Sequence, residues 1–240
     1  MIKVVIPASG AGVRFGADMP KQFFELNGEP ILKRTIAVFQ NLGMIDEIAV
    51  AVAPGYAHMV EDFGFNKVRH IVEGGQDRAS SVYAALKSLP KDTGIVLIHD
   101  GVRPFVTESI VRAVVDAVQK HGAAVACTSV TDTVKKIDFD NKITETIDRR
   151  LLWSAQTPQG FTYDIIMKAY QQAEQDGILS QVTDDSALVE RMGIPVCAVR
   201  SDFLNMKITT KTDLIIAEAY MGITANFKDH PYFKDLWGEH

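Results

Sequence analysis

Residues 2–16 read IKVVIPASGAGVRFG, and this stretch indicates the class of fold. Lys3–Ala8 is apolar apart from its first residue, which is typical of a strand covered on both faces of a sheet. Small residues follow the strand directly, and without bulky side chains the backbone N–H groups can approach a phosphate. A buried strand that leads into a glycine-rich loop is typical of α/β proteins, which bind ligands at the carboxyl ends of their strands.

Similar β-rich runs recur along the chain, separated by segments with helical spacing. Further strands are expected at 47–54, 70–73, 95–100, 123–130 and 195–200. Helices are expected at 107–121, 162–176 and 212–221, with Thr107 as the N-cap of the first and Gly122 just after its end. The alternation predicts an α/β fold of three layers, α/β/α and Rossmann-like, around a mostly parallel central sheet.

Two stretches depart from this alternation. From residue 222 onward the sequence is aromatic and charged without a period, so we expect one domain over residues 1–225 and a C-terminal tail over 226–240. Residues 133–147 look like two short strands joined by a turn, and both strands are too polar to be central in a sheet. They form either an exposed hairpin or a protruding β-arm, about 131–152, that packs on a second subunit, since a lone hairpin is marginally stable in water.

The composition excludes several classes of protein. The net charge of −5 argues against nucleic acid as the main partner. No apolar run reaches the roughly 18 residues of a membrane span, and the N-terminus lacks the layout of a signal peptide. Cys127 and Cys197 are far apart and belong to no CxxC or Cys/His cluster, so neither a zinc site nor a disulfide framework is indicated. We therefore expect a reduced, cytoplasmic protein with no membrane partner.

The glycine-rich loop after the first strand fits neither of two common nucleotide-binding motifs. Phe15 stands where the dinucleotide-binding fingerprint needs its third glycine, and a Walker P-loop would need GKS or GKT. Two cations, Arg14 and Lys21, follow the glycines closely. A plain tight turn would explain the glycines alone. The cations favour a triphosphate site in which Lys21 offsets developing negative charge.

Two further clusters combine small and charged residues. Gly74–Ser81 leads into a helix N-terminus, where N–H donors and the helix dipole favour an anion or a base edge. Taken alone, this cluster is more safely explained by Asp77 as an N-cap. Asp100 ends an expected strand, where it can hold Mg²⁺ together with substrate phosphates, and Arg103 can grip a second phosphate. We expect His99 to pack against or orient its neighbours, because no spacing typical of a catalytic base accompanies it.

Taken in order, the motifs of this chain resemble those of the 2-C-methyl-D-erythritol 4-phosphate cytidylyltransferases of the non-mevalonate isoprenoid pathway. The resemblance extends from about residue 2 to about residue 221. It rests on PASGAGVRFG with PKQ, GGQDRASSV, HDGVRPFV, DTVKK, IDRRLLWSAQTPQGF, TDDSALVERMG and NMKIT. It implies a nucleotidyltransferase that transfers CMP from CTP to methylerythritol phosphate and releases pyrophosphate, with Mg²⁺ or another divalent cation as cofactor.

The resemblance also implies roles for individual residues. CTP binding is implied for Ala8, Ser9, Gly10, Gly12, Gly75, Gln76, Arg78 and Ser81. Catalysis is implied for Arg14, Lys21 and Lys207, and metal binding for Asp100. Binding of the acceptor, a small polyol phosphate, is implied for Arg103, Thr133, Arg149, Thr183 and Lys207. In that family the polar arm crosses to the neighbouring subunit, so Thr133 and Arg149 would complete the partner's site in a homodimer.

Three other functions stay open at this point. A ribitol-5-phosphate cytidylyltransferase would share the fold and the CTP half of the site, although residues 148–160 and 183–185 look more like the methylerythritol enzyme. A non-catalytic nucleotide-binding module would not need the whole set of cations together with Asp100. A nicotinamide dehydrogenase ranks lowest, because the third glycine is missing and no acid ends the second strand.

Overall fold

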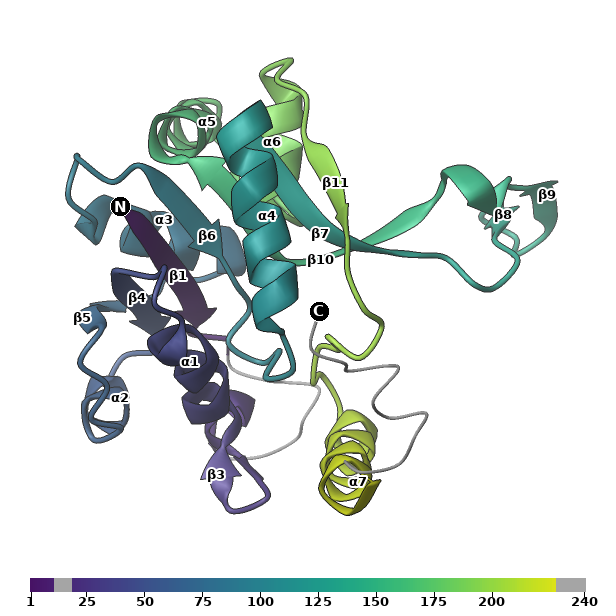
Figure 1. The fold of residues 1–240 in the computed structure, drawn as a ribbon. Coiled ribbons are helices and arrows are strands. Elements are labelled where there is room, and N and C mark those ends of the chain that lie inside the picture. The colour runs from purple at the N-terminus through teal and green to yellow at the C-terminus, as the bar shows by residue number, and fades with distance from the viewer. Residues whose placement is uncertain (11–18, 228–240) are drawn as a thin grey trace.

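The structure is a computed structural model that describes residues 1–10 and 19–227, and a mixed sheet lies at its centre (Figure 1). Within the described residues this sheet has seven strands, in the spatial order β11 (Cys197–Arg200), β7 (Ala123–Ser129), β10 (Trp153–Thr162), β6 (Ile95–Ile98), β1 (Ile2–Ala8), β4 (Glu47–Val52) and β5 (Val68–Glu73). All run parallel except β10, which is antiparallel to both of its neighbours. The expected mostly parallel sheet is confirmed.

Helices cover both faces of the sheet (Figure 1). They are α1 (Ile31–Asn41), α3 (Arg78–Ser88), α4 (Glu108–His121), α5 (Tyr163–Gln175) and α6 (Asp185–Arg191). Val4 and Ile6 of β1 pack into the core shared with α1 and α4, whereas Val5 packs into the core shared with α3, α5 and α6. Because successive side chains of a strand point to opposite faces, one apolar strand supplies both cores. The predicted α/β/α layering is confirmed.

Capping residues explain where two of the helices begin or end. The Thr107 hydroxyl accepts a hydrogen bond from the N–H of Ile110 at the start of α4, and Gly122 follows the helix with a φ of +82°. At α3 the Asp77 carboxylate accepts from the N–H of Ser80 at 2.7 Å. These three positions therefore have the capping roles expected from the sequence.

The predicted hairpin is present and projects from the body of the molecule (Figure 1). Its strands β8 (Lys135–Ile137) and β9 (Ile143–Thr146) are antiparallel, and the Asp138 carboxylate accepts bonds from two N–H groups of the turn between them. The chain enters the arm from β7 and leaves it into β10, which pairs with β7. The remaining short elements are η2 (Lys21–Phe23), β2 (Glu25–Leu26), β3 (Glu29–Pro30), α2 (Ala57–Glu61), η3 (Arg149–Leu151) and η4 (Leu179–Gln181).

Strand β10 is a correction to the expected set of strands. Polar residues and a proline interrupt residues 153–162, so the stretch shows neither an apolar run nor a regular alternation. It forms a strand because its backbone pairs with β6 on one side and β7 on the other, with a break in the β7 ladder between Ala155 and Gln159. Pairing with two central neighbours decides the conformation here, rather than local propensity.

Helix α7 (Lys211–Phe227) is a second correction, because it continues past the end expected at 221. Residues 222–227 are therefore helical. The sequence gives no amphipathic period here, since apolar side chains lie on several sides of the helix. Ala217 is buried, whereas Ile215 is 66% exposed.

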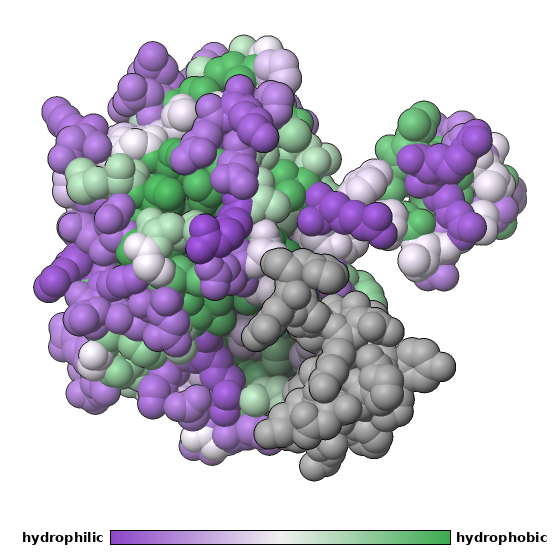
Figure 2. Space-filling model, in the orientation of Figure 1, coloured by the Kyte–Doolittle hydropathy of each residue, from purple (hydrophilic) through white to green (hydrophobic). Residues whose placement is uncertain are grey.

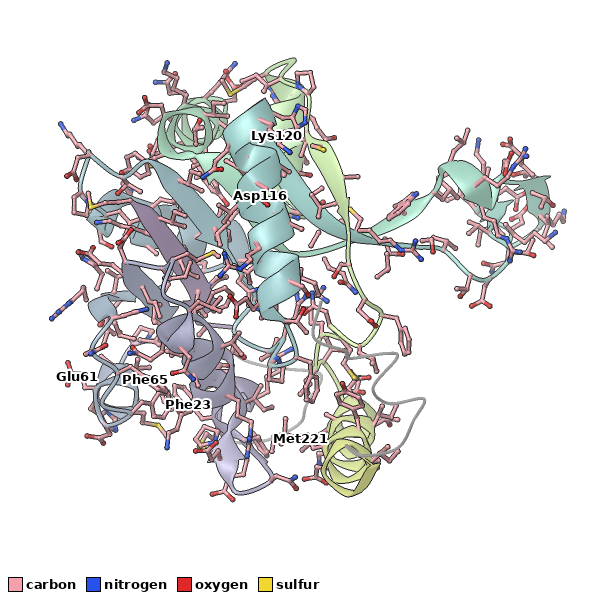
Figure 3. The ribbon with its side chains drawn as sticks, viewed as in Figure 1. Phe23, Glu61, Phe65, Asp116, Lys120 and Met221 are labelled. Atoms are coloured by element: carbon pink, nitrogen blue, oxygen red, sulfur yellow. The ribbon has the colours of Figure 1, made fainter. Side chains whose placement is uncertain are left out.

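A third, smaller apolar cluster fixes α7 to the rest of the molecule. Ala217 and the labelled Met221 (Figure 3) pack with Leu26, Ile31 and Val102. Elsewhere the visible face of the molecule mixes polar and apolar side chains (Figure 2). Among the helices of the described chain, none is both long and apolar enough to cross a membrane.

Candidate functional site

A pocket of about 270 Å³ lies at the carboxyl ends of β1 and β6. Its walls come from the end of β1, from η2, from the loop between β5 and α3, and from the residues after β6. The lining residues are Pro7, Ala8, Ser9, Gly10, Lys21, Gln22, Gly75, Gln76, Asp77, Arg78, Asp100, Gly101, Val102 and Lys207. Most of the residues that the sequence assigns to CTP and catalysis thus share one cavity, although they are distant along the chain.

Gly74 allows the loop after β5 to approach the end of β1, and Gly75 allows the same loop to approach the start of α3. A Cβ atom on Gly74 would lie 2.3 Å from the Ser9 Cβ, and one on Gly75 would lie 2.3 Å from the Ser80 Cβ. The hydroxyls of Ser9 and Ser81 are 2.5 Å apart. Ser81 donates its own proton to the Asp77 carbonyl oxygen, so Ser9 is the donor between the two hydroxyls. This contact joins the two loops that the sequence assigns to the nucleotide.

The segment that carries Lys21 is fixed to the same strand end. The buried side chain of Gln22 donates to the Ala8 carbonyl oxygen, which anchors η2 beside the last residue of β1. The ring of Phe23 stacks on Tyr56 at a centroid distance of 5.2 Å, which fixes the other side of η2. Lys21 therefore lines the pocket from a braced turn rather than from an unsupported loop.

Asp100 is the electrostatic centre of the site, because three cations contact it. Arg78 Nε lies 3.0 Å from its Oδ1, while Arg103 Nε and Lys207 Nζ lie 3.2 and 3.0 Å from its Oδ2. Burial on its own would raise the pKa of Asp100, but Arg78, Lys207 and Arg103 lower that pKa well below its usual range. The carboxylate is therefore ionised at neutral pH.

Arg78 also connects the site to α6. Its second contact is with Asp185, at 2.8 Å between Arg78 NH2 and Asp185 Oδ2, and the Asp185 side chain is fully buried. Tyr170 donates its hydroxyl proton to the other oxygen of Asp185. Burial tends to lower the pKa of Arg78, but Asp185 and Asp100 raise it well above its ordinary value. The guanidinium is therefore a fixed positive charge between two carboxylates.

A second, smaller pocket of about 110 Å³ adjoins the first. Its lining residues are Arg78, Asp100, Arg103, Ala155, Gln156, Thr157, Gln159, Thr183, Asp184 and Lys207. Arg78, Asp100 and Lys207 line both pockets. Arg103 and Thr183, assigned to the acceptor from the sequence, belong only to the smaller one. The charged centre is thus the boundary between two compartments.

His99 orients the segment that carries Asp100. The Asp100 N–H donates to the Thr157 hydroxyl at 3.0 Å, and Thr157 and His99 Nδ1 are 3.0 Å apart. His99 Nε2 lies 3.0 Å from the Arg103 carbonyl oxygen, which can only accept, so Nε2 carries the proton and Nδ1 accepts from Thr157. Burial lowers the pKa of His99 to about 4, so the ring is neutral at physiological pH. The expected orienting role, rather than that of a base, agrees with this geometry.

Three residues of the site had no role in the sequence prediction. Thr157 supports Asp100, and Asp185 pairs with Arg78. Gln159 accepts bonds from the N–H groups of Asp185 and Ser186 through its Oε1, which fixes the start of α6. Two sequence features could have indicated these residues: the polar run in 156–159 and the paired acids in 184–185. Both are unusual in segments that are largely buried in the structure.

Several predicted residues are not part of these pockets. Gly12 and Arg14 lie outside the described residues. Ser81 contacts Ser9 behind the pocket wall. Thr133 and Arg149 are exposed on or beside the arm, which projects away from the body of the molecule (Figure 1). Within one chain they line neither of the two pockets.

The donor set around Asp100 suits a hard cation only when substrate phosphates take part. Among the described residues, no group of three or more His, Cys, Asp or Glu side chains could hold a metal by itself. A single ionised carboxylate facing a pocket is nevertheless the usual protein share of a Mg²⁺ site whose other ligands are phosphate oxygens and water. Asp100 fits that role.

The sheet and the two adjoining pockets at its carboxyl edge, which share Arg78, Asp100 and Lys207, are those of an α/β nucleotidyltransferase. The chain belongs to the family "IspD: 2-C-methyl-D-erythritol 4-phosphate cytidylyltransferase", whose model matches residues 2–223. A protein of that name from Syntrophus aciditrophicus is 44% identical over 225 residues, 92% of this chain and 95% of the relative. Another from Symbiobacterium thermophilum is 41% identical over 217 residues, 90% of this chain and 91% of the relative.

A solved structure shows the same fold. The 4-diphosphocytidyl-2C-methyl-D-erythritol synthase from Anaerococcus prevotii superimposes with a TM-score of 0.83 at 32% identity, covering 92% of this chain and 96% of that one. The likeness extends through most of both chains. The family expected from the sequence is therefore confirmed.

Proposed function

We propose that this protein transfers the CMP group of CTP to 2-C-methyl-D-erythritol 4-phosphate and releases pyrophosphate. The observation that carries the proposal is the pair of adjoining pockets that share Arg78, Asp100 and Lys207. Two anionic substrates that react with each other need adjacent compartments and a common set of cations at their boundary. Membership of the family supports the identity of both substrates.

The larger pocket is the proposed site for CTP. The cytosine and ribose lie against Ala8, Ser9, Gly10, Gly75 and Gln76, mainly through backbone groups, and Ser81 supports Ser9 from behind the pocket wall. The start of α3 faces this pocket, and its N–H groups together with Arg78 favour a phosphate. Lys21 holds the triphosphate, and the family resemblance adds Gly12 and Arg14 to this role.

The smaller pocket is the proposed site for the phosphate of the acceptor. Arg103, Thr183 and Lys207 line it and offer two positive charges and a hydroxyl. The Arg103 guanidinium is held by Asp100 and by the Asn205 carbonyl oxygen, at 2.8 Å from NH1. A guanidinium fixed in this way presents its remaining N–H groups in one orientation, which suits a phosphate monoester.

The reaction requires no general base. The second pKa of a phosphate monoester is about 6, so the acceptor is largely dianionic at neutral pH. One of its oxygens attacks the α-phosphorus of CTP, a new P–O bond forms, the α–β bridging P–O bond breaks, and pyrophosphate leaves with that electron pair. Lys21 and Lys207 stabilise the charge that develops, and the family resemblance assigns Arg14 to the same task. The protein acts mainly by positioning and charge stabilisation.

A divalent cation, Mg²⁺ in the first instance, is proposed as cofactor. Asp100 would hold it together with phosphate oxygens of CTP, because a carboxylate and phosphates are the ligands that Mg²⁺ prefers. When bound, the ion neutralises part of the phosphate charge. The residues around it keep their own tasks: Arg78 and Arg103 hold Asp100 in place, and Lys207 contacts the reacting phosphates.

A homodimer is proposed from the arm. Its side chains include Ile137, Phe139, Ile143 and Leu151, which are 54%, 108%, 64% and 84% exposed, and apolar groups are visible on the arm in Figure 2. So many exposed apolar side chains on a thin hairpin favour a protein partner. In the dimer, Thr133 and Arg149 would reach the partner's acceptor site. A cytoplasmic location likewise stays a prediction.

Pyrophosphate release tests the proposed reaction. The protein is assayed with CTP and Mg²⁺, in parallel with methylerythritol 4-phosphate and with ribitol 5-phosphate. Rapid release with the first acceptor alone supports the proposal. A preference for ribitol 5-phosphate would keep the chemistry and change the acceptor. If a folded protein that binds CTP releases no pyrophosphate with either acceptor, the result would contradict the proposed transfer.

A further inference from the structure

The segment that carries Lys207 has no regular secondary structure of its own. It joins β11, which ends at Arg200, to α7, which begins at Lys211. Its backbone is fixed at both ends, by a bond from Ser201 N–H to the Cys127 carbonyl at 2.8 Å and one from Ile208 N–H to the Val102 carbonyl at 2.9 Å. The contacts that hold the residues between these two bonds therefore determine the position of the Lys207 backbone.

One side chain of β10 binds the first half of this segment at three points. Gln156 of β10 donates from Nε2 to the Asp202 carbonyl oxygen at 3.1 Å. Its Oε1 accepts from the Ser201 hydroxyl at 2.8 Å and from Asn205 Nδ2 at 3.1 Å. Gln156 is 8% exposed, so water competes little for these bonds.

Asn205 passes this restraint to the site. Its side chain is fully buried, and Nδ2 donates both to Gln156 and to the Thr157 carbonyl oxygen, the latter at 2.7 Å. Its backbone carbonyl accepts from Arg103 NH1. Lys207 lies two residues further on, with Nζ 3.0 Å from Asp100 Oδ2. The side chain of Lys207 therefore extends from a backbone that Gln156 and Asn205 hold against β10 by hydrogen bonds.

We infer that Gln156, acting through Asn205, is a positioning residue that holds Lys207 where the two pockets meet. The inference rests on the catalytic role proposed above for Lys207. Gln156 lines the smaller pocket but offers no charge to a substrate, and its amide oxygen and one of its two N–H donors are used by Ser201, Asp202 and Asn205. We therefore expect its effect on turnover to be indirect, through the position of the ammonium group.

The test uses an isosteric variant and a matched control. Gln156→Met keeps the volume of the side chain and removes all three bonds. Gln40→Met is the control, because Gln40 also ties a loop in place, by bonds to Asn66 and to the Lys67 N–H, at the amino end of β5 and away from the pockets. Both variants are expected to lose stability, which thermal unfolding reports, and both should still bind CTP.

Only the variant near the pockets is expected to lose turnover. We expect Gln156→Met to lower kcat by about 10²-fold, the scale of a small misplacement of a reacting group, and to change the KM for CTP by less than about threefold. Gln40→Met should keep wild-type kcat. Ser201→Ala removes one of the three bonds, so its kcat should lie between those of Gln156→Met and Gln40→Met. If Gln156→Met does not fold, the kcat of Ser201→Ala provides the test.

A double variant separates positioning from general damage. In the Lys207→Ala background, Gln156→Met should cause no further loss of kcat, because there is no ammonium group left to position. Losses that multiply, or wild-type kcat in Gln156→Met, would overturn the inference while leaving the proposed function intact. Wild-type turnover in Lys207→Ala would instead contradict the role proposed for Lys207, and the inference with it.

Discussion

At the scale of single residues, the centre of the site is one carboxylate among three cations. Asp100 loses hydration by burial, and the three neighbouring charges more than compensate, so its pKa stays well below the usual range. Arg78 and Arg103 are held in turn by Asp185 and by the Asn205 carbonyl oxygen. In the proposed function, a substrate phosphate would find these cations already in place, so less order would have to be created on binding.

Lys21 provides the first prediction. Lys21→Ala is expected to keep the fold and to lower kcat by about 10²–10³-fold, because one charge contact to the transition state is lost. Steady-state kinetics with CTP and the acceptor measure the effect. Lys33→Ala is the control, since Lys33 pairs with Glu29 near the surface. A Lys21→Ala enzyme that turns over like wild type would remove Lys21 from catalysis.

His99 provides a prediction about pH. Its pKa is about 4 in the folded protein, below the ordinary value of about 6.5, so between these pH values the unfolded chain binds a proton that the folded protein does not. The free energy of unfolding is therefore highest above about pH 6.5 and decreases as the pH falls toward 4. Between about pH 7.5 and pH 5 this residue alone accounts for about 2 kcal/mol.

Urea unfolding at those two pH values checks the effect of His99. In His99→Gln, which cannot take up a proton, the difference in free energy of unfolding between the two pH values should be smaller by about 2 kcal/mol than in wild type. The other histidines contribute equally to both proteins. The same pH dependence in both would show that His99 is not the group that titrates.

Single residues of the site were predictable where the sequence places them next to a strand end or a helix start. Asp100 and Gly75 are of this kind. Partnerships were not predictable, because the contact of Arg78 with Asp185, or of Thr157 with the Asp100 N–H, depends on how distant segments pack. The neutral state of His99 follows from burial, which a sequence motif does not report.

At the scale of elements, the site depends on how closely the loop after β5 approaches the end of β1. Gly74→Ala would place a methyl group 2.3 Å from the Ser9 Cβ, so the loop must move away. Overpacking of this kind costs about 1–3 kcal/mol, and we expect CTP binding to weaken by about tenfold or more.

Isothermal titration of CTP measures this effect of Gly74→Ala. Gly43→Ala is the matched control, because a Cβ there meets nothing within 4 Å and its φ is not in the left-handed region. The control should bind CTP like wild type. If the two variants bind equally well, then close approach of the loop to Ser9 is not needed for the nucleotide.

Elements were predictable where local signals agree with the packing. Strand β1 and helix α4 have both an apolar pattern and clear boundaries, and both were expected near their observed bounds. Strand β10 has neither signal. Several of its side chains are polar and line the smaller pocket, and its strand conformation depends on pairing with β6 and β7. The end of α7 was missed because apolar residues lie on several sides of that helix.

At the scale of the whole molecule, the arm predicts complementation between subunits. In the proposed homodimer each pocket combines its own Lys21 with Arg149 of the partner subunit. Lys21→Ala and Arg149→Ala should each be nearly inactive alone. A mixed dimer then contains one intact pocket, made from the unchanged Lys21 of one subunit and the unchanged arm of the other.

Mixing the two inactive variants tests this arrangement. After unfolding and refolding together in equal amounts, about half of the dimers are mixed and half of their sites are intact, so about a quarter of wild-type activity should return. Each variant refolded alone is the control. No return of activity, with mixed dimers present, would show that the arm does not complete the partner's site.

The pairing of β7 with β10 has a consequence for how such proteins can diversify. Ser129 of β7 pairs with Trp153 of β10 at the end of the ladder that is nearest to the arm. The arm therefore begins beyond residues whose pairing already fixes the two strands in the sheet. Insertions or deletions in the arm therefore leave the register of the sheet unchanged. Across a lineage the arm can lengthen, shorten or change its chemistry, while Gln156, Thr157 and Gln159 keep their places beside the smaller pocket.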